Sequence, residues 1–470
     1  MTKEILYLKI AKAIAWQIKK GVWKAGEKLP SLRTISHENG VSLNTAIQAY
    51  YELEKEGFII ACPKSGYIVN YKPLRQSVPE TTQPPVRFAG EEDEDLITEV
   101  YSSIEDMSVT RFSLGVPEDV LLPIAKINKE LTKAMYSLPG NGTRYEDPQG
   151  NSRLRKDIAR FTYNWNGNLT EDDLVTTTGV TNAISLALSV IAQKGDTIAV
   201  ESPVYFGILQ LATSMGLRVL ELPTNPVTGI DPDALKKVLP QIDLCLLISN
   251  FSNPMGSCMP DEHKKAIVSM LAERDIPLIE DDLYGDVFFG ASRPKPCKAF
   301  DENGLVIWCG SFSKTLVPGY RVGWVAPGKF KDAVIRRKHI HQISTPTLNQ
   351  EVIARFLEND RYENHLRKLR HELHTNSLHF AQSIRNYFPE DTKLITPQGG
   401  FMLWVELSRK ADTTELYHKA MQQKISIAPG RMFTLQDQYR NCMRLSYGQR
   451  WCPFIEERLM LLGDIIKKSL

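Results

Sequence analysis

The sequence predicts an α/β protein in which a small, mainly helical unit precedes a large body with a mostly parallel sheet. Three observations predict this fold class. Residues 1–72 contain three helical patterns separated by glycines, residues 73–108 are acidic and contain four prolines, and beyond residue 109 helical stretches alternate with short apolar runs. A chain of 470 residues is long enough for two or three compact units with a large buried core.

The formal net charge of +2 conceals an uneven distribution along the chain. In residues 1–72, ten Lys and one Arg stand against six Glu, a net charge of +5, whereas residues 73–108 hold two Arg against nine acidic residues, a net charge of −7. An acidic stretch with several prolines is typical of a flexible linker. We therefore predict a basic domain over residues 1–72, a linker over 73–108 and a large domain over 109–470.

Composition excludes several other classes of protein. The seven cysteines form no C-x-x-C pair, so the sequence indicates neither a disulfide framework nor a metal site. The longest apolar runs, such as residues 244–248, are far shorter than the roughly 20 residues that cross a bilayer, and the N-terminus has no signal-peptide pattern. We expect a cytoplasmic protein without membrane association.

Three helices are predicted in the basic domain. Apolar residues recur at every fourth position from Leu6 to Ile18, which predicts a helix that Gly21 ends. Ser31 and Ser42 are placed to cap a second and a third helix, with a glycine turn between them. Two helices joined in this way form a helix-turn-helix, whose second helix presents its N-terminal side chains to base edges in the major groove.

Two short strands should follow these helices. Residues 58–60 and 66–69 have strand-like patterns on either side of residues 63–65, which predicts a hairpin wing with Lys64 at its tip. A purely structural three-helix module has the same pattern. The net charge of +5 and Lys64 favour DNA binding, because neutralised phosphates supply most of the non-specific affinity for DNA.

Four sequence runs resemble the GntR class of bacterial transcription regulators across residues 7–70. They are L-P-S-L-R from residue 29, G-V-S-L-N-T from 40, A-Y-x-x-L-x-x-E-G from 49 and S-G-Y-I-V from 65. In one departure from many relatives, Leu43 follows the capping serine where they have arginine. The resemblance implies contacts with double-stranded operator DNA from Arg33, Ser42, Asn44, Thr45 and Gly66.

Polar clusters in the large domain follow the apolar runs that we predict as buried parallel strands. The runs lie at residues 198–200, 244–248, 278–279 and 306–308, and a V-T-T-T-G stretch at 175–179 leads into a helix over 182–192. Functional residues of such sheets gather at the carboxyl ends of the strands.

The G-S-F-S-K run at 310–314 follows one of these strands, and its lysine has three interpretations. Lys314 could be a solvated surface residue. Its S-x-x-K spacing matches the acylating serine motif of penicillin-binding enzymes, although the companion K-T-G and S-D-N elements are absent. Lys314 could also form a Schiff base with pyridoxal 5′-phosphate.

The third interpretation requires particular partners for the cofactor. These are a carboxylate for the pyridine nitrogen, donors to the phenolate oxygen, an aromatic face for the ring, and a helix N-terminus with a cation for the phosphate. Strand ends and helix starts in the sequence supply candidates for each, namely one carboxylate of the run Glu280-Asp281-Asp282, then Asn253, Tyr284, Tyr205, the helix start Gly179-Val180-Thr181 and Arg321.

The order of these pieces resembles the fold-type-I pyridoxal phosphate enzymes of the aspartate aminotransferase class over residues 110–470. The resemblance implies a smaller C-terminal α+β part, and it makes Lys314 the internal aldimine lysine and Asp281 the partner of the pyridine nitrogen. Asn253 and Tyr284 become the phenolate donors and Tyr205 the stacking ring. The implied phosphate ligands are Val180, Thr181, Ser311, Ser313 and Arg321.

Two further positions carry over from the same resemblance. Tyr145 matches a tyrosine that reaches the phosphate of the partner subunit, which implies a homodimer, and Arg444 matches the arginine that grips a substrate α-carboxylate. Two details depart from the commonest pattern. A G-V-T-N run at 179–182 replaces G-A-Q-Q, and Leu283 precedes Tyr284, as in the E-D-D-P-Y spacing of aminoadipate-type and kynurenine-type aminotransferases.

A GntR-type head, an acidic linker and an aminotransferase-like body together form the architecture of the MocR regulators, which the chain resembles over nearly its whole length. The leading hypothesis is a transcription regulator that binds operator DNA and senses an amino acid or amine by aldimine exchange at Lys314. The alternative is a working aminotransferase with an accessory DNA-binding head. A degenerate fold that binds no cofactor is a third possibility.

Overall fold

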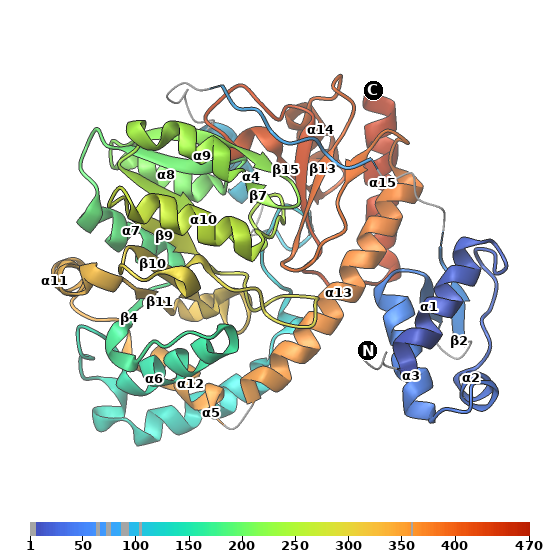
Figure 1. Cartoon of the computed structure of the whole chain (residues 1–470), viewed down its shortest axis with the longest axis horizontal. Helices are drawn as coiled ribbons and strands as arrows, with labels where there is room; N and C mark the ends of the chain where they lie inside the picture. The colour runs from blue at the N-terminus through green and yellow to red at the C-terminus, as the bar shows by residue number, and fades with distance from the viewer. Residues whose placement is uncertain (1–5, 63–65, 72–76, 86–93, 103–105, 359–360) are drawn as a thin grey trace. The chain divides into compact units, whose positions relative to one another are not determined.

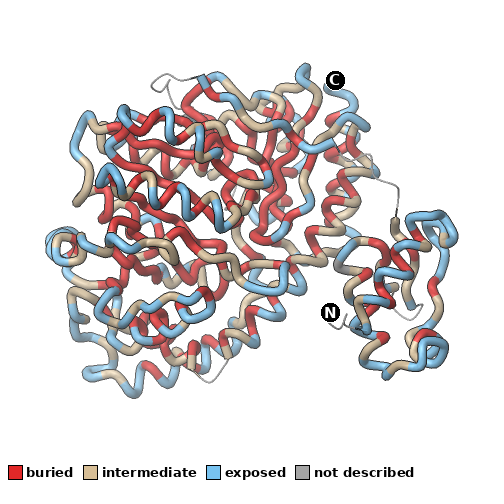
Figure 2. The backbone as a smooth tube through the Cα atoms, viewed as in Figure 1, coloured by how far each residue is buried: buried red, intermediate tan, exposed pale blue. Residues whose placement is uncertain are grey.

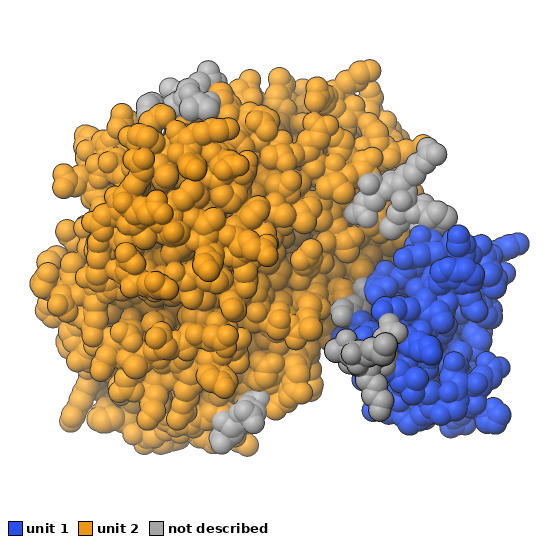
Figure 3. Space-filling view, viewed as in Figure 1, with its two compact units in different colours: residues 1–76 blue, residues 77–470 orange. Residues whose placement is uncertain are grey.

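The computed structural model describes residues 6–62, 66–71, 77–85, 94–102, 106–358 and 361–470. The chain divides into two compact units, Met1–Gln76 and Ser77–Leu470 (Figure 3). Each unit has its own hydrophobic core. Figure 2 shows the buried residues of each unit in red. We describe the two units separately.

The first unit is a winged helix-turn-helix (Figure 1). Helices α1 (Leu6–Lys19), α2 (Leu32–Glu38) and α3 (Leu43–Lys55) precede an antiparallel hairpin of β1 (Ile59–Cys62) and β2 (Gly66–Val69). The serine caps are confirmed, because the amide N–H groups of Thr34 and Thr45 each donate to the predicted serine hydroxyl over 3.1 Å.

Successive turns of α1 pack against α3 to form the core of this unit. Ile10, Ile14 and Ile18 of α1 and Tyr50 of α3 are buried, and the Tyr50 hydroxyl donates to the carbonyl of Pro30 over 2.7 Å. Leu6 differs from the prediction because its side chain is 52% exposed. The buried apolar stripe therefore begins at Ile10, one helical turn after Leu6, where the four-residue spacing predicts its start.

An eight-stranded sheet forms the centre of the second unit, in the order β4-β11-β10-β9-β8-β5-β6-β7. The strands from β10 to β6 are parallel, whereas β11 pairs antiparallel with both neighbours and β7 pairs antiparallel with β6. Their bounds are β4 Val175–Thr177, β5 Thr197–Ser202, β6 Arg218–Asn225, β7 Gly229–Ile230, β8 Leu244–Leu247, β9 Leu278–Asp281, β10 Val306–Ser311 and β11 Gly323–Ala326. The four apolar runs predicted as parallel strands are confirmed as β5, β8, β9 and β10.

Both faces of this sheet are covered by helices. Within β8, Leu244 and Leu246 belong to the core cluster that contains α7 (Val180–Ile191), while Cys245 and Leu247 belong to the cluster with α9 (Pro232–Val238) and α10 (Asp261–Ala272). Burial on both sides explains why the strands have continuous apolar sequences and no alternation of polar and apolar residues. Helix α7 begins two residues before the predicted 182–192 helix.

A smaller C-terminal part contains an antiparallel sheet in the order β12-β13-β16-β15, which confirms the predicted α+β part. These strands are Lys393–Leu394, Met402–Glu406, Cys442–Ser446 and Ala428–Pro429, and a separate parallel pair joins β3 (Thr110–Arg111) to β14 (Ile425–Ser426). The other helices are α4 Glu94–Ser102, α5 Ile124–Ser137, α6 Ser152–Phe161, α8 Phe206–Ser214, α11 Lys331–Gln342, α12 Thr347–Leu357, α13 Arg361–Tyr387, α14 Thr413–Gln422 and α15 Pro453–Ser469. Among the described helices, none combines the length and apolarity needed to cross a membrane.

Part of the predicted linker belongs to the second unit, in contrast to the flexible tether that we expected over residues 73–108. The backbone N–H of Thr82 donates to the carbonyl of Thr224 over 3.0 Å, and its hydroxyl donates to the carbonyl of Ser202 over 2.7 Å. Helix α4 buries Leu96, Ile97 and Val100 in the main core. We predicted a linker because the stretch is acidic. Its three apolar residues have helical spacing, however, and they form an apolar face that packs a short helix against the core.

We expect removal of a buried α4 side chain to destabilise the second unit. Leu96→Ala should lower the free energy of unfolding by about 2–5 kcal/mol, because Leu96 is 4% exposed and its loss leaves a cavity. Thr98→Ala, on the exposed face of the same helix, should change it by less than about 0.5 kcal/mol. Urea denaturation of the full chain measures both values, and equal effects would mean that α4 is not docked.

Candidate functional site

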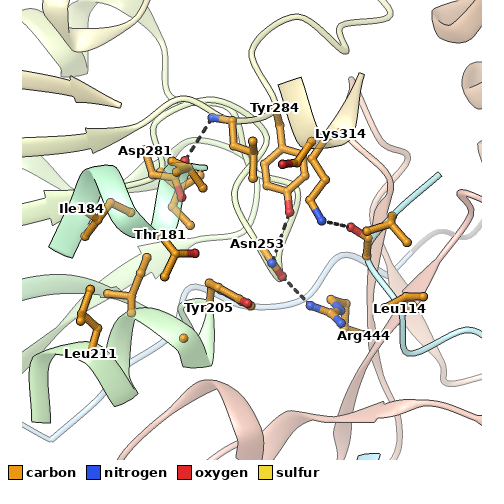
Figure 4. A pocket seen from close by; sticks show the side chains of 18 of the residues that line it. Leu114, Thr181, Ile184, Tyr205, Leu211, Asn253, Asp281, Tyr284, Lys314 and Arg444 are labelled. Atoms are coloured by element: carbon orange, nitrogen blue, oxygen red, sulfur yellow. Dashed lines mark hydrogen bonds between the residues drawn. The ribbon is translucent and has the colours of Figure 1, made fainter. Parts of the chain in front are cut away.

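One pocket in the second unit lies beyond the carboxyl ends of β8, β9 and β10 and has a volume of about 220 Å³ (Figure 4). This is the position at which parallel α/β sheets bind ligands. The lining includes most of the sequence-predicted cofactor residues, which are Val180, Thr181, Tyr205, Asn253, Asp281, Tyr284, Ser313, Lys314, Arg321 and Arg444.

Lys314 lies in the turn after β10, and its half-buried side chain extends into the pocket. Its Nζ atom donates to the carbonyl of Gly115 over 2.5 Å (Figure 4). Desolvation, followed by the positive charges of Arg444 and Arg321, lowers the pKa of Lys314 to about 7, against the opposing effect of Asp281. A large fraction of the amine is therefore neutral, and so nucleophilic, near neutral pH.

Asp281 is the last residue of β9, the strand next to β10, and its side chain is buried. Burial raises the pKa of Asp281 to about 7, although its Oδ1 atom accepts the backbone N–H of Leu283 over 3.1 Å. Because its pKa is close to neutral pH, the Asp281 carboxyl group ionises readily when a cationic group comes into contact with it. Asp281 can therefore hold a protonated ring nitrogen.

Asn253 connects Tyr284 to Arg444 on one wall of the pocket. Its Nδ2 atom lies 3.4 Å from the Tyr284 hydroxyl, and its Oδ1 atom accepts from an Arg444 guanidinium N–H over 2.9 Å (Figure 4). A second N–H of Arg444 donates to the carbonyl of Ser113, whereas its Nε atom has no hydrogen-bond partner among the described residues. A guanidinium that is 1% exposed with an unused donor is suited to binding an anion.

Gly179 and Arg321 form a cradle at the start of α7. Gly179 has a φ of +95°, and a Cβ atom on it would lie 2.5 Å from an Arg321 guanidinium nitrogen. Arg321 also donates to the Ser313 hydroxyl over 3.0 Å. The N–H groups at the start of α7 and the Arg321 cation together suit a phosphate, and Val180 and Thr181 open that helix as predicted.

Tyr205 presents its ring to the pocket immediately before α8. A Cβ atom on Gly207 would lie 2.6 Å from this ring, so only a glycine at position 207 leaves enough space for the ring. Burial and the neighbouring Tyr101 and Tyr284 hydroxyls raise the pKa of Tyr205, which keeps its phenol neutral. The flat, neutral ring can stack on an aromatic cofactor.

Two sequence-predicted cofactor residues lie outside the lining. The buried Ser311 hydroxyl donates to the carbonyl of Val322 over 2.8 Å and accepts the backbone N–H of Ser313 over 3.1 Å, so it shapes the turn that holds Ser313. Tyr145 is 83% exposed and does not reach the pocket of its own chain.

Apolar residues complete the pocket, and sequence reasoning missed them. They come from α4, from the segment after β3 and from α8, and they are Tyr101, Leu114, Val116, Ile208 and Leu211. No motif marks these positions. The spacing of apolar residues within the acidic segment is the one signal that could have identified the α4 contribution.

The described DNA-binding candidates of the first unit lie in the first turn of α2, at the start of α3 and at the start of β2. Arg33, Ser42 and Asn44 are exposed and Thr45 is half-buried, with the Ser42 and Thr45 hydroxyls 2.8 Å apart in the helix cap. Gly66 is exposed, and Lys64 lies outside the described residues.

One further candidate at the hairpin was missed. The Lys28 side chain passes 3.4 Å from where a Cβ atom on Gly66 would lie, which places a cation beside the wing. Leu43, which replaces the arginine of many relatives, is 45% exposed at the first turn of α3.

A lysine at the end of a parallel strand, with a carboxylate on the neighbouring strand and an anion cradle at a helix start, defines a class of cofactor-dependent proteins that includes the aminotransferases. Residues 109–450 match the family described as aminotransferase class I and II, and residues 6–69 match the bacterial regulatory proteins of the gntR family. The chain belongs to the aminotransferase class I and II family and has a GntR-type helix-turn-helix at its N-terminus. The predicted MocR-type architecture is thereby confirmed.

Proteins of the same architecture are similar to the chain over their whole length. Two uncharacterised HTH-type transcriptional regulators of Escherichia coli strain K12, YjiR and YdcR, are 34% and 33% identical to it, over 99% of each chain. Among solved structures, the α-aminoadipate aminotransferase LysN of Thermus thermophilus, in complex with N-(5′-phosphopyridoxyl)-L-leucine, is 25% identical with a TM-score of 0.74. That likeness covers 80% of this chain and 95% of LysN.

We expect Lys314 to react with amine-directed reagents at unusually low pH. Because its pKa is lowered to about 7, about half of the amine is neutral at pH 7, and labelling of the cofactor-free protein should reach half of its maximum near that pH. Asp281→Asn should move this midpoint to lower pH, because the Asp281 carboxylate favours the protonated amine. Mass spectrometry of the labelled peptide measures the profile, and a midpoint near the ordinary lysine value of about 10.4 would contradict the expectation.

Proposed function

We propose that this protein is a transcription regulator that binds operator DNA through its first unit and senses an amino acid through pyridoxal 5′-phosphate in its second unit. The observation that carries the proposal is the presence, in one chain, of a capped helix-turn-helix and a pocket in which Lys314, Asp281 and Arg444 converge. Full-length relatives that are named transcriptional regulators support it.

The residues of the pocket fit pyridoxal 5′-phosphate. The cradle of Gly179, Ser313 and Arg321 suits its phosphate, Asp281 suits its pyridine nitrogen, and Asn253 with Tyr284 suits its phenolate oxygen. When bound, the cofactor supplies an aldehyde that reacts with primary amines and a ring that withdraws electrons. The family match supports the same cofactor.

Lys314 is the residue through which this chain would register an incoming amine. With the cofactor bound, Lys314 and the amine of the ligand would compete for the aldehyde carbon, and a bound ligand would leave the Lys314 side chain free. The freed amine, with its pKa lowered to about 7, can take up a proton near neutral pH. The change in charge and position of one side chain within a packed pocket can bias two arrangements of the surrounding domain.

Arg444 favours an amino acid over a simple amine as the ligand. Its unused Nε donor and its fixed guanidinium, which lies 5.0 Å from the centre of the Phe433 ring, suit bidentate binding of an α-carboxylate. Amines without a carboxylate would leave this buried cation without an anionic partner, which costs free energy.

Tyr145 supports the proposal that the chain acts as a homodimer. Because it is 83% exposed and outside the pocket of its own chain, its predicted role as a phosphate ligand requires a second copy. Two copies would present two helix-turn-helix units, as palindromic operators require. The residues that would contact DNA are Arg33, Ser42, Asn44, Thr45, Gly66 and the predicted wing residue Lys64. This binding would take place in the cytoplasm, where the sequence predicts the protein to be.

An active aminotransferase is the second candidate function. The groups that transamination needs are present in the pocket, including a lysine able to accept and return a proton and an arginine for the α-carboxylate of amino and keto acids. The similarity to LysN supports this candidate. Turnover distinguishes it from sensing, because a sensor needs only binding.

We expect Gly179→Ala to weaken binding of the cofactor at least tenfold. The new Cβ atom would lie 2.5 Å from the Arg321 guanidinium and push it out of the cradle. Gly195→Ala is a matched control, because Gly195 has a φ of +96° and open space around it, so it imposes the same backbone strain without the clash. Fluorescence titration of cofactor-free protein measures the affinities. Equal losses in both variants would argue against the cradle.

The regulator proposal predicts salt-sensitive, sequence-preferring DNA binding whose affinity changes at least fivefold with an amino acid that alters the absorbance of the bound cofactor. Lys314→Ala should lose the response to the amino acid and keep binding to DNA, because the helix-turn-helix is a separate unit. Mobility-shift assays across salt concentrations measure both. Absence of specific DNA binding would contradict the regulator proposal, and steady-state turnover of amino acid with a 2-oxoacid, abolished in Lys314→Ala, would establish the aminotransferase.

A further inference from the structure

Tyr101 of α4 brings the acidic segment into the ligand pocket. Its ring packs edge-on against Phe206, with centroids 5.1 Å apart, and its hydroxyl interacts with that of Tyr205. Tyr101 also acts electrostatically on Tyr284, as does Arg444. Tyr101 therefore lines the ligand pocket beside Tyr205.

The charged residues around the pocket all have a role in the proposed function. Among the described lining residues, the cations are Lys314, Arg321 and Arg444, and the carboxylate is Asp281. Lys314 would react with the amine of the ligand, and Arg444 would bind its α-carboxylate. Arg321 would bind the phosphate of the cofactor, and Asp281 its ring nitrogen. The described lining thus offers neither a cation for an acidic ligand side chain nor an acid for a basic one.

Apolar side chains also line the pocket. Leu114 and Val116 come from the segment after β3, and Ile208 and Leu211 come from α8, with Leu114 and Leu211 on opposite sides of the pocket (Figure 4). Such a surface stabilises an apolar side chain by removing it from water, whereas a charged side chain would lose its hydration there without gaining a partner.

We propose that the pocket selects α-amino acids with apolar side chains and that Tyr101 is a specificity-determining residue of the site. This inference rests on the proposed function, since it assumes that the amine and carboxylate of the ligand bind at Lys314 and Arg444. The acidic segment, which follows the helix-turn-helix, would thus contact the side chain of the ligand directly through Tyr101.

A second contact ties the same segment to the pocket wall. Thr82 binds the carbonyl of Ser202, which lies three residues before Tyr205, and the intervening Val204 donates its N–H to the carbonyl of Phe433 over 3.0 Å. The Phe433 ring lies beside Arg444. Two described parts of the segment, residues 77–85 and α4, are therefore connected to residues that would bind the ligand.

The test is a ligand series on the full-length, cofactor-loaded protein. L-methionine and L-glutamate have side chains of similar length and differ in charge, and L-leucine, L-phenylalanine and L-lysine extend the comparison. Absorbance of the bound cofactor and titration calorimetry give dissociation constants without reliance on turnover. We expect L-methionine, L-leucine or L-phenylalanine to bind at least tenfold more tightly than L-glutamate and L-lysine.

Two arginine variants test the role of Tyr101. Tyr101→Arg should shift the preference at least tenfold toward L-glutamate, because it adds a cation to the apolar wall. Thr98→Arg adds the same charge on the exposed face of the same helix and should keep the wild-type preference. If Tyr101→Arg does not fold, Tyr101→Phe serves in its place and should keep the preference for apolar ligands, while the wild-type series still decides the ligand class.

The outcomes separate this inference from the proposed function. Equal or tighter binding of L-glutamate or L-lysine would overturn the inference alone, and would point to a charged residue from a second copy, such as the exposed Arg144 beside Tyr145. The same preference in both arginine variants would overturn the role of Tyr101. Absence of any response to amino acids, in protein that holds the cofactor, would overturn the proposed function as well.

Discussion

Desolvation of Lys314 is the interaction on which the rest of the site depends. Its amine lies at the end of β10, next to the strand that ends in Asp281, within reach of the positive charges of Arg321 and Arg444. Water would keep this amine protonated and chemically inert. The surrounding sheet and helices exclude water and hold two further cations nearby, so the neutral amine becomes accessible near physiological pH. Every ligand role assigned to the pocket assumes this reactive amine.

The parallel sheet explains why these groups meet. Parallel strands all end at the same edge, so residues that follow β8, β9 and β10 converge although they are separated by tens of positions in the sequence. Helices on both faces bury the strands and leave the carboxyl edge as the open side. Arg444 then reaches the same edge from the smaller antiparallel sheet, where it pairs with Asn253. The pocket is thus shared by two parts of one unit.

The acidic segment connects the two functions of the chain more closely than its composition indicates. A flexible tether could hold the helix-turn-helix near the receptor but would transmit little about the ligand. Thr82 and α4 are instead attached to the second unit, where α4 is part of the hydrophobic core and Tyr101 lines the pocket. A rearrangement at this wall is therefore a rearrangement of the segment that continues toward the DNA-binding unit. Coupling of this kind would need two arrangements of a packed element.

The sequence by itself determined the two classes of domain, the helix caps at Ser31 and Ser42, the parallel strands and half of the residues that line the pocket. These features follow from local patterns, because helix capping, apolar periodicity and polar residues at strand ends are encoded over a few neighbouring positions. Only the tertiary structure decided that Ser311 supports the turn instead of facing the pocket, that Tyr145 lies outside its own site, and that α4 is docked. Each of these depends on packing between distant segments, and for α4 the burial of three apolar side chains outweighed the strongly acidic composition around them.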